Sequence, residues 1–293
     1  MAAPLPHALS TAGARPRCLT IAGSDPSGGA GIQGDLKTFT VLGAYGMAVL
    51  TALTAQNTLG VTGVMAVDPD FVRAQLAAVL DDIGCDGAKT GMLATAALVE
   101  AVAGLLGSRF AAGGAFPLVV DPVLVATSGD RLLDADAVRA IRERLLPLAA
   151  LATPNAPEAA VLAGFDVNTP DDAERAARVI HTMGPKAVLV KGGDADLDGE
   201  LVTDVFFDGV EAVRWTEPRV PTRHTHGSGC ALAAAAAVAM ACGADPREAA
   251  MEGRRFVLRA IRSAALPGGA PGGGNGPVDH LAWLAGCGVH APD

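Results

Sequence analysis

Thr225-His226-Gly227-Ser228-Gly229-Cys230 runs directly into the alanine-rich residues 231–242, and this stretch decides the fold. A Gly-Ser-Gly turn before a long helix gathers backbone N–H groups and the positive end of the helix dipole at one point, where an anion is stabilised. The apolar run from Cys230 to Cys242 has 13 residues, which is too short to span a bilayer and is typical of a buried helix. We therefore predict a buried helix that begins at a phosphate-binding turn.

Cys230 lies on the first turn of this predicted helix. A helix N-terminus lowers the pKa of a thiol and favours the thiolate, so Cys230 is a candidate base. A glycine-containing helix start with a small buried residue explains the same six residues equally well. The rest of the chain has to decide between the two interpretations.

The composition narrows the class of protein. Half of the 293 residues are apolar and only 4% are aromatic, so the core must consist mainly of Ala, Val and Leu, as in layered α/β proteins. The net charge of -9, without a Lys/Arg cluster, argues against nucleic acid or an anionic membrane as the main partner. The five cysteines are widely spaced, which indicates neither a zinc site nor a disulfide framework and fits a reducing cytoplasm.

The N-terminal segment has a different character from the rest. Residues 1–16 contain three prolines and no apolar run long enough for the core of a signal peptide. We expect a disordered tail there and a single domain in residues 17–293, although length is only a soft guide to domain count.

Short apolar runs alternate with helical patterns along most of the chain, as a parallel sheet with crossover helices requires. Strands are predicted at residues 18–22, 47–55, 88–90, 118–120, 151–153 and 187–190, and helices at 32–42, 95–106, 134–146, 171–183, 230–242 and 246–265. Asp208-Gly209 predicts an antiparallel hairpin between residues 201–207 and 210–215. The amphipathic pattern of residues 246–265 predicts a solvent-exposed face that carries Arg254, Arg255, Arg259 and Arg262.

Several chemically capable residues fall at or just after the ends of predicted strands. These residues are Gly23, Gln56, Met92, Asp121, Asn155 and Lys191. Ligands of open α/β sheets bind at the carboxyl ends of the strands, so we expect these residues to converge on one site. Asp121 and Glu158 suit a hydrated Mg²⁺, and Lys191 suits a phosphoryl group. A turn residue, a first-turn helix acid and an exposed strand end are the simpler explanations of each residue alone.

One motif points elsewhere at first sight. Gly29-Ala30-Gly31-Ile32-Gln33-Gly34 matches the dinucleotide-binding pattern G-x-G-x-x-G after a predicted strand. Its first glycine comes several residues after the strand, where a dinucleotide site needs a tight turn, and no acid lies between Asp35 and Asp68 to hold a ribose. The match therefore does not indicate a nicotinamide or flavin site.

Seven blocks of the sequence form a recognisable set. They are AGSDPSGGAGIQ (residues 22–33), GAYG (43–46), AQNT (55–58), KTGML (89–93), TPN (153–155), PEA (157–159) and THGSGC (225–230). Together they closely resemble the hydroxymethylpyrimidine/phosphomethylpyrimidine kinases of thiamine biosynthesis, which belong to the ribokinase-like superfamily. The likeness runs from about residue 17 to about residue 283. It implies a three-layer α/β/α sandwich with a mostly parallel central sheet.

The resemblance also implies a role for individual residues. Gly23, Asp35 and Gln56 would hold the aminopyrimidine, whose adjacent donor and acceptor atoms a carboxylate or amide can match, and Met92 and Val123 would pack on its ring. The other implied site residues are Asp121 and Glu158 for the metal, Lys191, Thr225 and Asn155 for ATP and its phosphates, Gly227, Ser228 and Gly229 for the anion hole, and Cys230 as the base. ATP and Mg²⁺ are the implied cofactors.

The chain departs from the family pattern in three places. Thr127 stands in the loop after the Asp121 strand where many relatives have a lysine, so a cation is missing on the nucleotide side. Ser228 replaces a commoner threonine and keeps its hydroxyl group. The Gly/Pro-rich residues 267–277 form an enlarged segment.

We expect an enzyme that transfers the γ-phosphoryl group of ATP to 4-amino-5-hydroxymethyl-2-methylpyrimidine and then phosphorylates the monophosphate to the diphosphate. Pyridoxal kinase is the nearest alternative, because relatives with the same Gly-x-Gly-Cys ending accept that similar heterocycle. A non-catalytic pyrimidine-binding protein is more distant, as is a cysteine hydrolase with Cys230 as nucleophile and His224 or His226 as base. The expected partners are small molecules, without nucleic acid or membrane and with a homodimer left open, in the cytoplasm.

Overall fold

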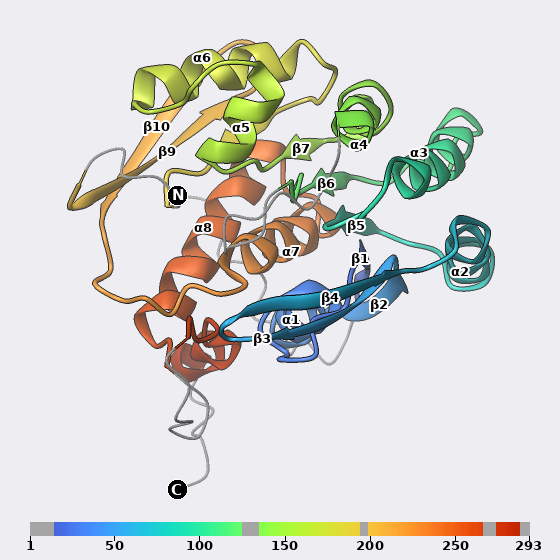
Figure 1. Ribbon diagram of the computed structural model, residues 1–293, viewed down its shortest axis with the longest axis horizontal. Helices are drawn as coiled ribbons and strands as arrows, with labels where there is room; N and C mark the ends of the chain where they lie inside the picture. Colours follow the sequence, from blue (N-terminus) through green and yellow to red (C-terminus); the bar gives the residue numbers. More distant parts are fainter. Residues whose placement is uncertain (1–14, 125–134, 194–198, 266–273, 288–293) are drawn as a thin grey trace, which may run out of the picture.

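The centre of the molecule is an eight-stranded sheet with the strand order β10-β9-β8-β7-β6-β5-β1-β2 (Figure 1). The computed structural model describes residues 15–124, 135–193, 199–265 and 274–287. The six strands from β8 to β2 in this order pair in parallel, and β9 is antiparallel to both of its neighbours, β8 and β10. The strands are β1 (Arg17–Ala22), β2 (Tyr45–Leu50), β5 (Gly87–Thr90), β6 (Leu118–Val120), β7 (Leu151–Ala152), β8 (Val188–Val190), β9 (Leu201–Phe207) and β10 (Ala212–Pro218).

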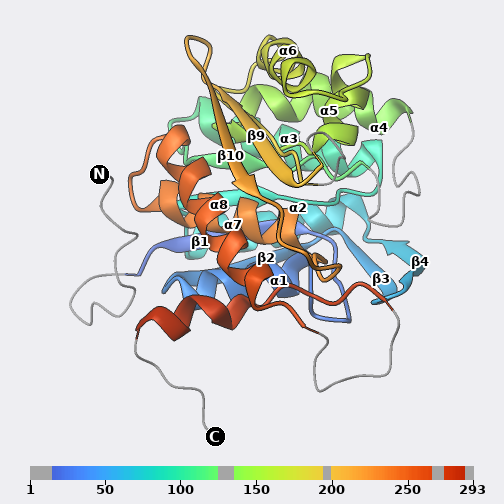
Figure 2. The same ribbon diagram turned by 90° about the vertical axis from the view of Figure 1, so that its left-hand side faces the viewer.

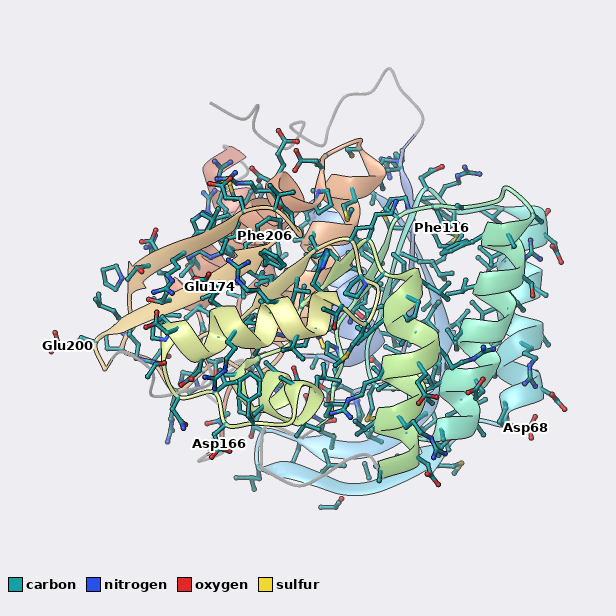
Figure 3. The ribbon with its side chains drawn as sticks, turned by 90° about the horizontal axis from the view of Figure 1, so that it is seen from above. Asp68, Phe116, Asp166, Glu174, Glu200 and Phe206 are labelled. Atoms are coloured by element: carbon teal, nitrogen blue, oxygen red, sulfur yellow. The ribbon has the colours of Figure 1, made fainter. Side chains whose placement is uncertain are left out.

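Helices cover both faces of the sheet, and each face has its own apolar core. One core lies under α2 (Pro69–Asp82), α3 (Ala96–Ala111), α4 (Ala135–Ala140), α5 (Ala156–Ala163) and α6 (Pro170–His181). Seen from above, several of these helices lie side by side across that face (Figure 3). The other core lies under α1 (Gly31–Val41), α7 (Ser228–Ala241) and α8 (Pro246–Arg262), with the short helix η4 (His280–Cys287) beside α1 and α8 (Figure 2). The predicted three-layer α/β/α sandwich is confirmed.

The helix that follows the opening motif is the most enclosed element of the fold. Every residue of α7 from Ala231 to Met240 is buried, as the apolar run predicts. Small side chains let α7 pack close to the sheet. A Cβ added at Gly87 of β5 would lie 2.8 Å from the Ala237 carbonyl oxygen, so the close approach requires glycine at that position.

The chain reverses its direction of travel through the sheet between β1 and β5. β2 lies on one side of β1, while β5, β6, β7 and β8 follow one another on the other side. Such a switch point leaves a crevice at the carboxyl ends of the parallel strands. The segments after β1, β5, β6, β7 and β8 therefore end at one edge of the sheet.

The prediction of one buried strand over residues 47–55 is wrong. The central strand β2 ends at Leu50, and residues 52–57 form β3 (Ala52–Asn57), which pairs with β4 (Gly60–Ala66) in a separate antiparallel hairpin. The break falls at Thr51, whose N–H still donates to Ala22 O of β1, whereas its carbonyl oxygen accepts from the Val67 N–H just after β4. Its hydroxyl donates to Met92 O. The continuous apolar run hides this change of sheet.

Two further predictions need correction. Residues 134–146 do not form one α-helix, because α4 passes into the π-helix η1 (Ile141–Leu145) and the 3-10 helix η2 (Leu146–Leu148). Arg254 is not on the solvent-exposed face of α8. It is buried, donates to Asp204 at 2.6 Å and lies over the Trp215 ring, because it lies about one helical turn from the buried residues Ala250 and Val257, at the edge of the inward face. The 201–215 hairpin is confirmed as β9 and β10.

Some expectations fall on residues that the structure does not describe. Most of the predicted tail (residues 1–14), Thr127 and residues 267–273 of the Gly/Pro segment lie outside the described residues. None of the helices within the described ranges has the length and apolar character that crossing a bilayer requires.

Replacing Arg254 with Met should lower the free energy of unfolding by about 3–5 kcal/mol, because it leaves the carboxylate of Asp204 buried without its cation. Urea denaturation monitored by circular dichroism would measure the difference. Arg262→Met on the same helix is the control, since Arg262 is exposed and such surface changes stay within about 0.5 kcal/mol. Equal stability losses in the two variants would contradict the assigned role of Arg254.

Candidate active site

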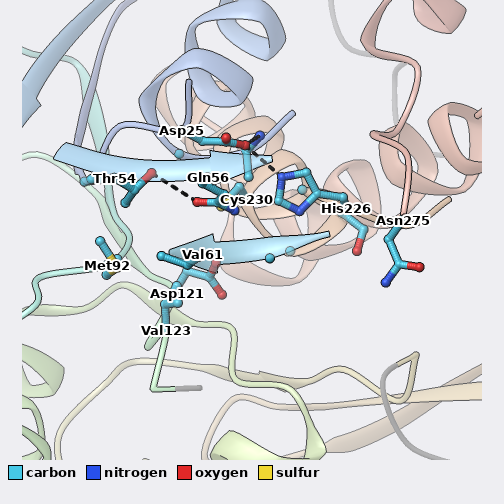
Figure 4. Close-up of a pocket in the computed structure, with 18 of the residues that line it drawn as sticks. Asp25, Thr54, Gln56, Val61, Met92, Asp121, Val123, His226, Cys230 and Asn275 are labelled. Atoms are coloured by element: carbon cyan, nitrogen blue, oxygen red, sulfur yellow. Dashed lines mark hydrogen bonds and ion pairs between the residues drawn. The ribbon is translucent and has the colours of Figure 1, made fainter. Parts of the chain in front are cut away.

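A cavity of about 640 Å³ lies at the carboxyl edge of the parallel strands (Figure 4). Its walls come from the loop after β1, the β3–β4 hairpin, the ends of β5 to β8 and the start of α7. The structure brings together there all but one of the residues predicted for the site. Those that line the cavity are Gly23, Gln56, Met92, Asp121, Val123, Asn155, Glu158, Lys191, Thr225, Gly227, Ser228, Gly229 and Cys230.

Two helix N-termini face this cavity without a side-chain cap. α2, α3, α5, α6 and α8 each begin with a side chain that accepts a first-turn N–H. α1 and α7 have no such cap and no acidic residue in the first turn, and their first residues, Gly31 and Ser228, line the cavity. The first N–H groups of a helix lack acceptors within the helix. Neighbouring residues accept from some of them, since the Ile32 N–H donates to Gly23 O and the Ser228 N–H to Thr225 O. An anion in the cavity would accept from the remaining N–H groups and meet two positive helix ends.

The turn before α7 depends on glycine. Gly227 has a φ of 82°, in the left-handed region, and a Cβ on it would lie 2.0 Å from Gly29 O. A Cβ on Gly229 would lie 3.1 Å from Lys191 Nζ. Glycine at 227 allows the loop after β1 to touch the start of α7, and glycine at 229 leaves room for the lysine. The sequence predicts this turn correctly as the joint between a loop and a helix.

A carboxylate and a cation stand together opposite this turn. Lys191 Nζ donates to Asp121 Oδ1 at 2.8 Å, and the Thr153 hydroxyl donates to the same oxygen at 3.1 Å. Glu158 and Asn155 form a capping box at the start of α5, in which each side chain accepts from the other residue's backbone N–H. The capping box fixes Glu158 at the cavity wall beside the Asp121–Lys191 pair.

The opposite wall is largely apolar and belongs to the hairpin. Val61 and Val64 of β4 line the cavity together with Met92 and Val123, and Val61, Met92 and Val123 are labelled in Figure 4. The hairpin also contributes polar groups, among them Gln56, whose amide oxygen accepts from the Thr54 hydroxyl at 3.3 Å. This combination of apolar faces and polar groups suits a flat heterocycle with donor and acceptor atoms on its edge.

The carboxylate of Asp25 ties the loop after β1 to the start of α7. It accepts from His226 Nε2 at 2.7 Å, from the Ala30 N–H at 2.8 Å, and from both the hydroxyl and the N–H of Ser27 at 2.9 Å. Burial raises the pKa of Asp25, but the hydrogen bonds from His226, Ser27 and Ala30 outweigh it and lower the pKa to about 2. Asp25 is therefore a charged acceptor at neutral pH.

The prediction of a lowered pKa for Cys230 is wrong. Burial is the largest influence and raises the pKa, the ammonium of Lys89 opposes it, and the carboxylates of Asp35 and Asp121 raise it further, to about 11. A hydrogen bond from the Gly31 N–H favours the thiolate but is weaker than these effects. The resting thiol is protonated at neutral pH, because desolvation exceeds the helix dipole.

The predicted direct contact between Asp35 and substrate is also corrected. Asp35 is completely buried behind the cavity, where its carboxylate accepts from Lys89 Nζ and the Thr20 hydroxyl. It does not line the cavity. The sequence around an acid on a helix does not show whether its side chain faces the cavity or the protein interior. Only the position of α1 in the fold shows that Asp35 faces the interior.

Sequence reasoning missed several residues that line the cavity. Asp25 lies inside a quoted block without a predicted role, and His226 is predicted only as a candidate base of the cysteine-hydrolase alternative. Val61 and Val64 lie on a strand that the apolar pattern does not resolve. Asn275 was also missed. Its N–H donates to Thr58 O at 2.8 Å, which joins the C-terminal segment to the tip of the hairpin.

Known proteins with similar sequences and structures place this geometry in context. The family model for phosphomethylpyrimidine kinase matches residues 25–279. The chain is 48% identical to the hydroxymethylpyrimidine/phosphomethylpyrimidine kinase of Streptomyces coelicolor, over 92% of this chain and 96% of that protein. It is 47% identical to the thiamine biosynthesis bifunctional protein ThiED of Geobacter sulfurreducens, over 90% of this chain but only 52% of that protein. The ADP complex of Bacillus subtilis pyridoxal kinase has a TM-score of 0.82 and 37% identity, over 93% of this chain and 100% of that chain.

Replacing Asp25 with Asn should lower the free energy of unfolding at pH 7 by about 2 kcal/mol, the value of a pKa lowered from 3.8 to about 2. Because the folded pKa is lowered, the contribution is complete above pH 4 and is lost as the pH falls through 2. Urea denaturation at several pH values would measure it. Asp68→Asn, which keeps an N-cap acceptor on α2, is the control; a pH-independent difference for Asp25→Asn would rule out the charged-acceptor role.

Proposed function

Because the chain belongs to the phosphomethylpyrimidine kinase family, we propose that this cavity is where it phosphorylates its pyrimidine. The chain is a hydroxymethylpyrimidine/phosphomethylpyrimidine kinase of thiamine biosynthesis, with the ribokinase-like fold and ATP as the phosphoryl donor. It covers about half of the bifunctional ThiED relative, so the other activity of that protein is no part of the proposal.

The observation that supports this site for the reaction is that one end of the cavity is positively charged and the other is largely apolar. At one end, the uncapped N-termini of α1 and α7 and the ammonium of Lys191 supply positive charge for the γ-phosphoryl group. At the other end, the hairpin supplies apolar walls and the amide of Gln56 for the pyrimidine ring. A substrate seated this way has its hydroxymethyl group directed toward Cys230, which lies between the two ends.

The acidic residues fit a magnesium ion. Asp121 and Glu158 line the cavity on the same side as Lys191, and no cluster of three or more His, Cys, Asp or Glu that could hold a metal occurs in the described part of the chain. Mg²⁺ typically takes one or two carboxylates and completes its shell with water and phosphate oxygens. We propose that Asp121 and Glu158 hold it. Bound Mg²⁺ would neutralise charge on the phosphates during transfer.

In the proposed reaction each residue positions a group or moves a proton. The loop of Gly227, Ser228 and Gly229 forms the anion hole for the phosphoryl group, with Thr225 and Asn155 at the nucleotide side of the wall. The Ser228 N–H is bonded to Thr225 O, so the other N–H groups at the start of α7 serve the phosphoryl group. The thiolate form of Cys230 takes the proton of the substrate hydroxyl as its oxygen attacks the γ-phosphorus. Phosphoryl transfer depends mainly on positioning and charge, so a thiolate present in a small fraction of molecules suffices at neutral pH. A homodimer and a cytoplasmic location stay predictions.

Replacing Cys230 with Ala should reduce kcat by about 10²–10⁴-fold, the usual value of a positioned base, and leave the KM for ATP within about twofold. Because burial raises the thiol pKa to about 11, the thiolate fraction of the wild type grows as the pH rises. The wild-type kcat should therefore increase between pH 7 and 9.5, and the variant should lack this increase. Coupled ADP-release assays would measure both profiles. Parallel profiles would exclude Cys230 as the base.

Pyridoxal kinase is the alternative that the structural similarity favours. A pyridine ring of similar size with a hydroxymethyl group would fit the same apolar wall. We expect kcat/KM for hydroxymethylpyrimidine to exceed that for pyridoxal by at least about tenfold, the scale on which a site discriminates between analogues. Parallel assays with both substrates and the pyrimidine monophosphate would decide, and a higher value for pyridoxal would overturn the assignment of the pyrimidine as principal substrate.

A further inference from the structure

An ion pair without any exposure to solvent lies behind the cavity. Lys89 Nζ donates to the two carboxylate oxygens of Asp35 at 3.1 and 3.3 Å, and both side chains are 0% exposed. The Thr20 hydroxyl donates to the same carboxylate at 2.6 Å. The three residues come from β5, α1 and β1, respectively, the elements that flank the switch point of the sheet.

Such a pair is costly for the fold alone. Removing two charges from water costs several kcal/mol per ion, and a pair of apolar residues of similar volume is often as stable or more stable. Within the described residues, Asp35 is the only hydrogen-bond partner of the Lys89 ammonium. The pair therefore calls for an explanation beyond packing.

Its position supplies one. A Cβ added at Gly91 would lie 3.0 Å from Lys89 Nζ, so the ammonium lies against the turn that leads to Met92 in the cavity wall. Gly31, the first residue of α1, donates its N–H to the Cys230 sulfur. Asp35 of the buried pair thus lies one turn of α1 after Gly31, whose N–H donates to the sulfur of Cys230.

The charges around Cys230 come from three sides. Lys89 of β5 is the strongest charge that favours the thiolate, and Asp35 of α1 and Asp121 after β6 oppose it. Lys191 is bonded to Asp121. Burial tends to lower the pKa of Lys89, but Asp35, Cys230 and Asp121 raise it well above its ordinary value, so the ammonium stays charged.

We propose that Lys89, held in place by Asp35 and Thr20, is a positioning residue whose buried positive charge favours the thiolate form of Cys230. The inference rests on the proposed role of Cys230 as base. In the step that it assists, the substrate O–H bond breaks and an S–H bond forms on Cys230. The electron pair of the oxygen forms the bond to the γ-phosphorus, and the bond from that phosphorus to the leaving oxygen of ADP breaks.

The direct test removes both charges together, so that neither is left buried alone. In the double variant Lys89→Met/Asp35→Asn, the pH midpoint of Cys230 alkylation by iodoacetamide should move up, because the loss of Lys89 outweighs the loss of the opposing charge of Asp35. The shift should be smaller than the unit or more that a single neighbouring charge causes. Peptide mass spectrometry identifies Cys230 among the other cysteines. At pH 7.5, kcat should fall by the same factor as the thiolate fraction, with the KM for ATP within about twofold. If the double variant is unstable, Lys89→Gln replaces it, because its amide still reaches Asp35. This variant should also raise the pH midpoint of Cys230 alkylation.

The matched control is Arg17→Met/Asp86→Asn. It removes the charges of an ion pair at the opposite end of the same two strands, where Arg17 begins β1 and Asp86 precedes β5, and should leave the Cys230 midpoint unchanged. An unchanged midpoint in folded Lys89 variants would overturn the inference. This outcome is distinct from a failure of the proposed function, because alkylation is measured without turnover. The proposed role of Cys230 as base would fail only if the Cys230→Ala variant were fully active.

Discussion

The contact between the loop after β1 and the start of α7 is the constraint on which the site depends. Gly227 takes a left-handed backbone conformation against Gly29 O, and the Asp25 carboxylate bonds both to that loop and to His226. This contact brings two uncapped helix ends to one point. Two like-signed helix ends repel each other, so the buried negative charge of Asp25 offsets part of that repulsion.

Charge is arranged in layers behind this contact. The outer layer consists of Lys191 with Asp121 at the cavity wall, and the inner layer consists of Lys89 with Asp35 beneath the floor. Cys230 lies between the two layers, which explains why its pKa cannot be deduced from helix position alone. A helix dipole contributes only a partial charge that lowers the thiol pKa. Burial and the full negative charges of Asp35 and Asp121 raise that pKa and outweigh the dipole.

The sequence predicts the parts of the site that obey a strand rule. Asp121, Asn155 and Lys191 follow strands of a parallel sheet, whose carboxyl ends must meet, so their convergence needs no tertiary information. The sequence does not place Asp35 and Arg254 correctly, because helical periodicity shows only which residues share one face of a helix. Whether a charged residue on that face is paired in the interior or exposed to solvent depends on the element packed against it. The hairpin was missed because Thr51, a single residue in an apolar run, ends one sheet and begins another.

The hairpin also explains how one framework serves related substrates. The proposed phosphoryl end of the cavity is built from sheet ends and helix N-termini, whose positions are fixed by the core. The proposed ring end is built from β3 and β4, which belong to a separate two-stranded sheet. This hairpin is tied to the rest at Thr51, at the bonds of Ser24 to Ala52 and Thr54, and at the Thr58–Asn275 bond. Changes in Val61 or Val64 can reshape the ring wall without disturbing the phosphoryl end. A shared fold at a TM-score of 0.82 with a pyridoxal kinase therefore constrains the transfer chemistry more tightly than it constrains the heterocycle.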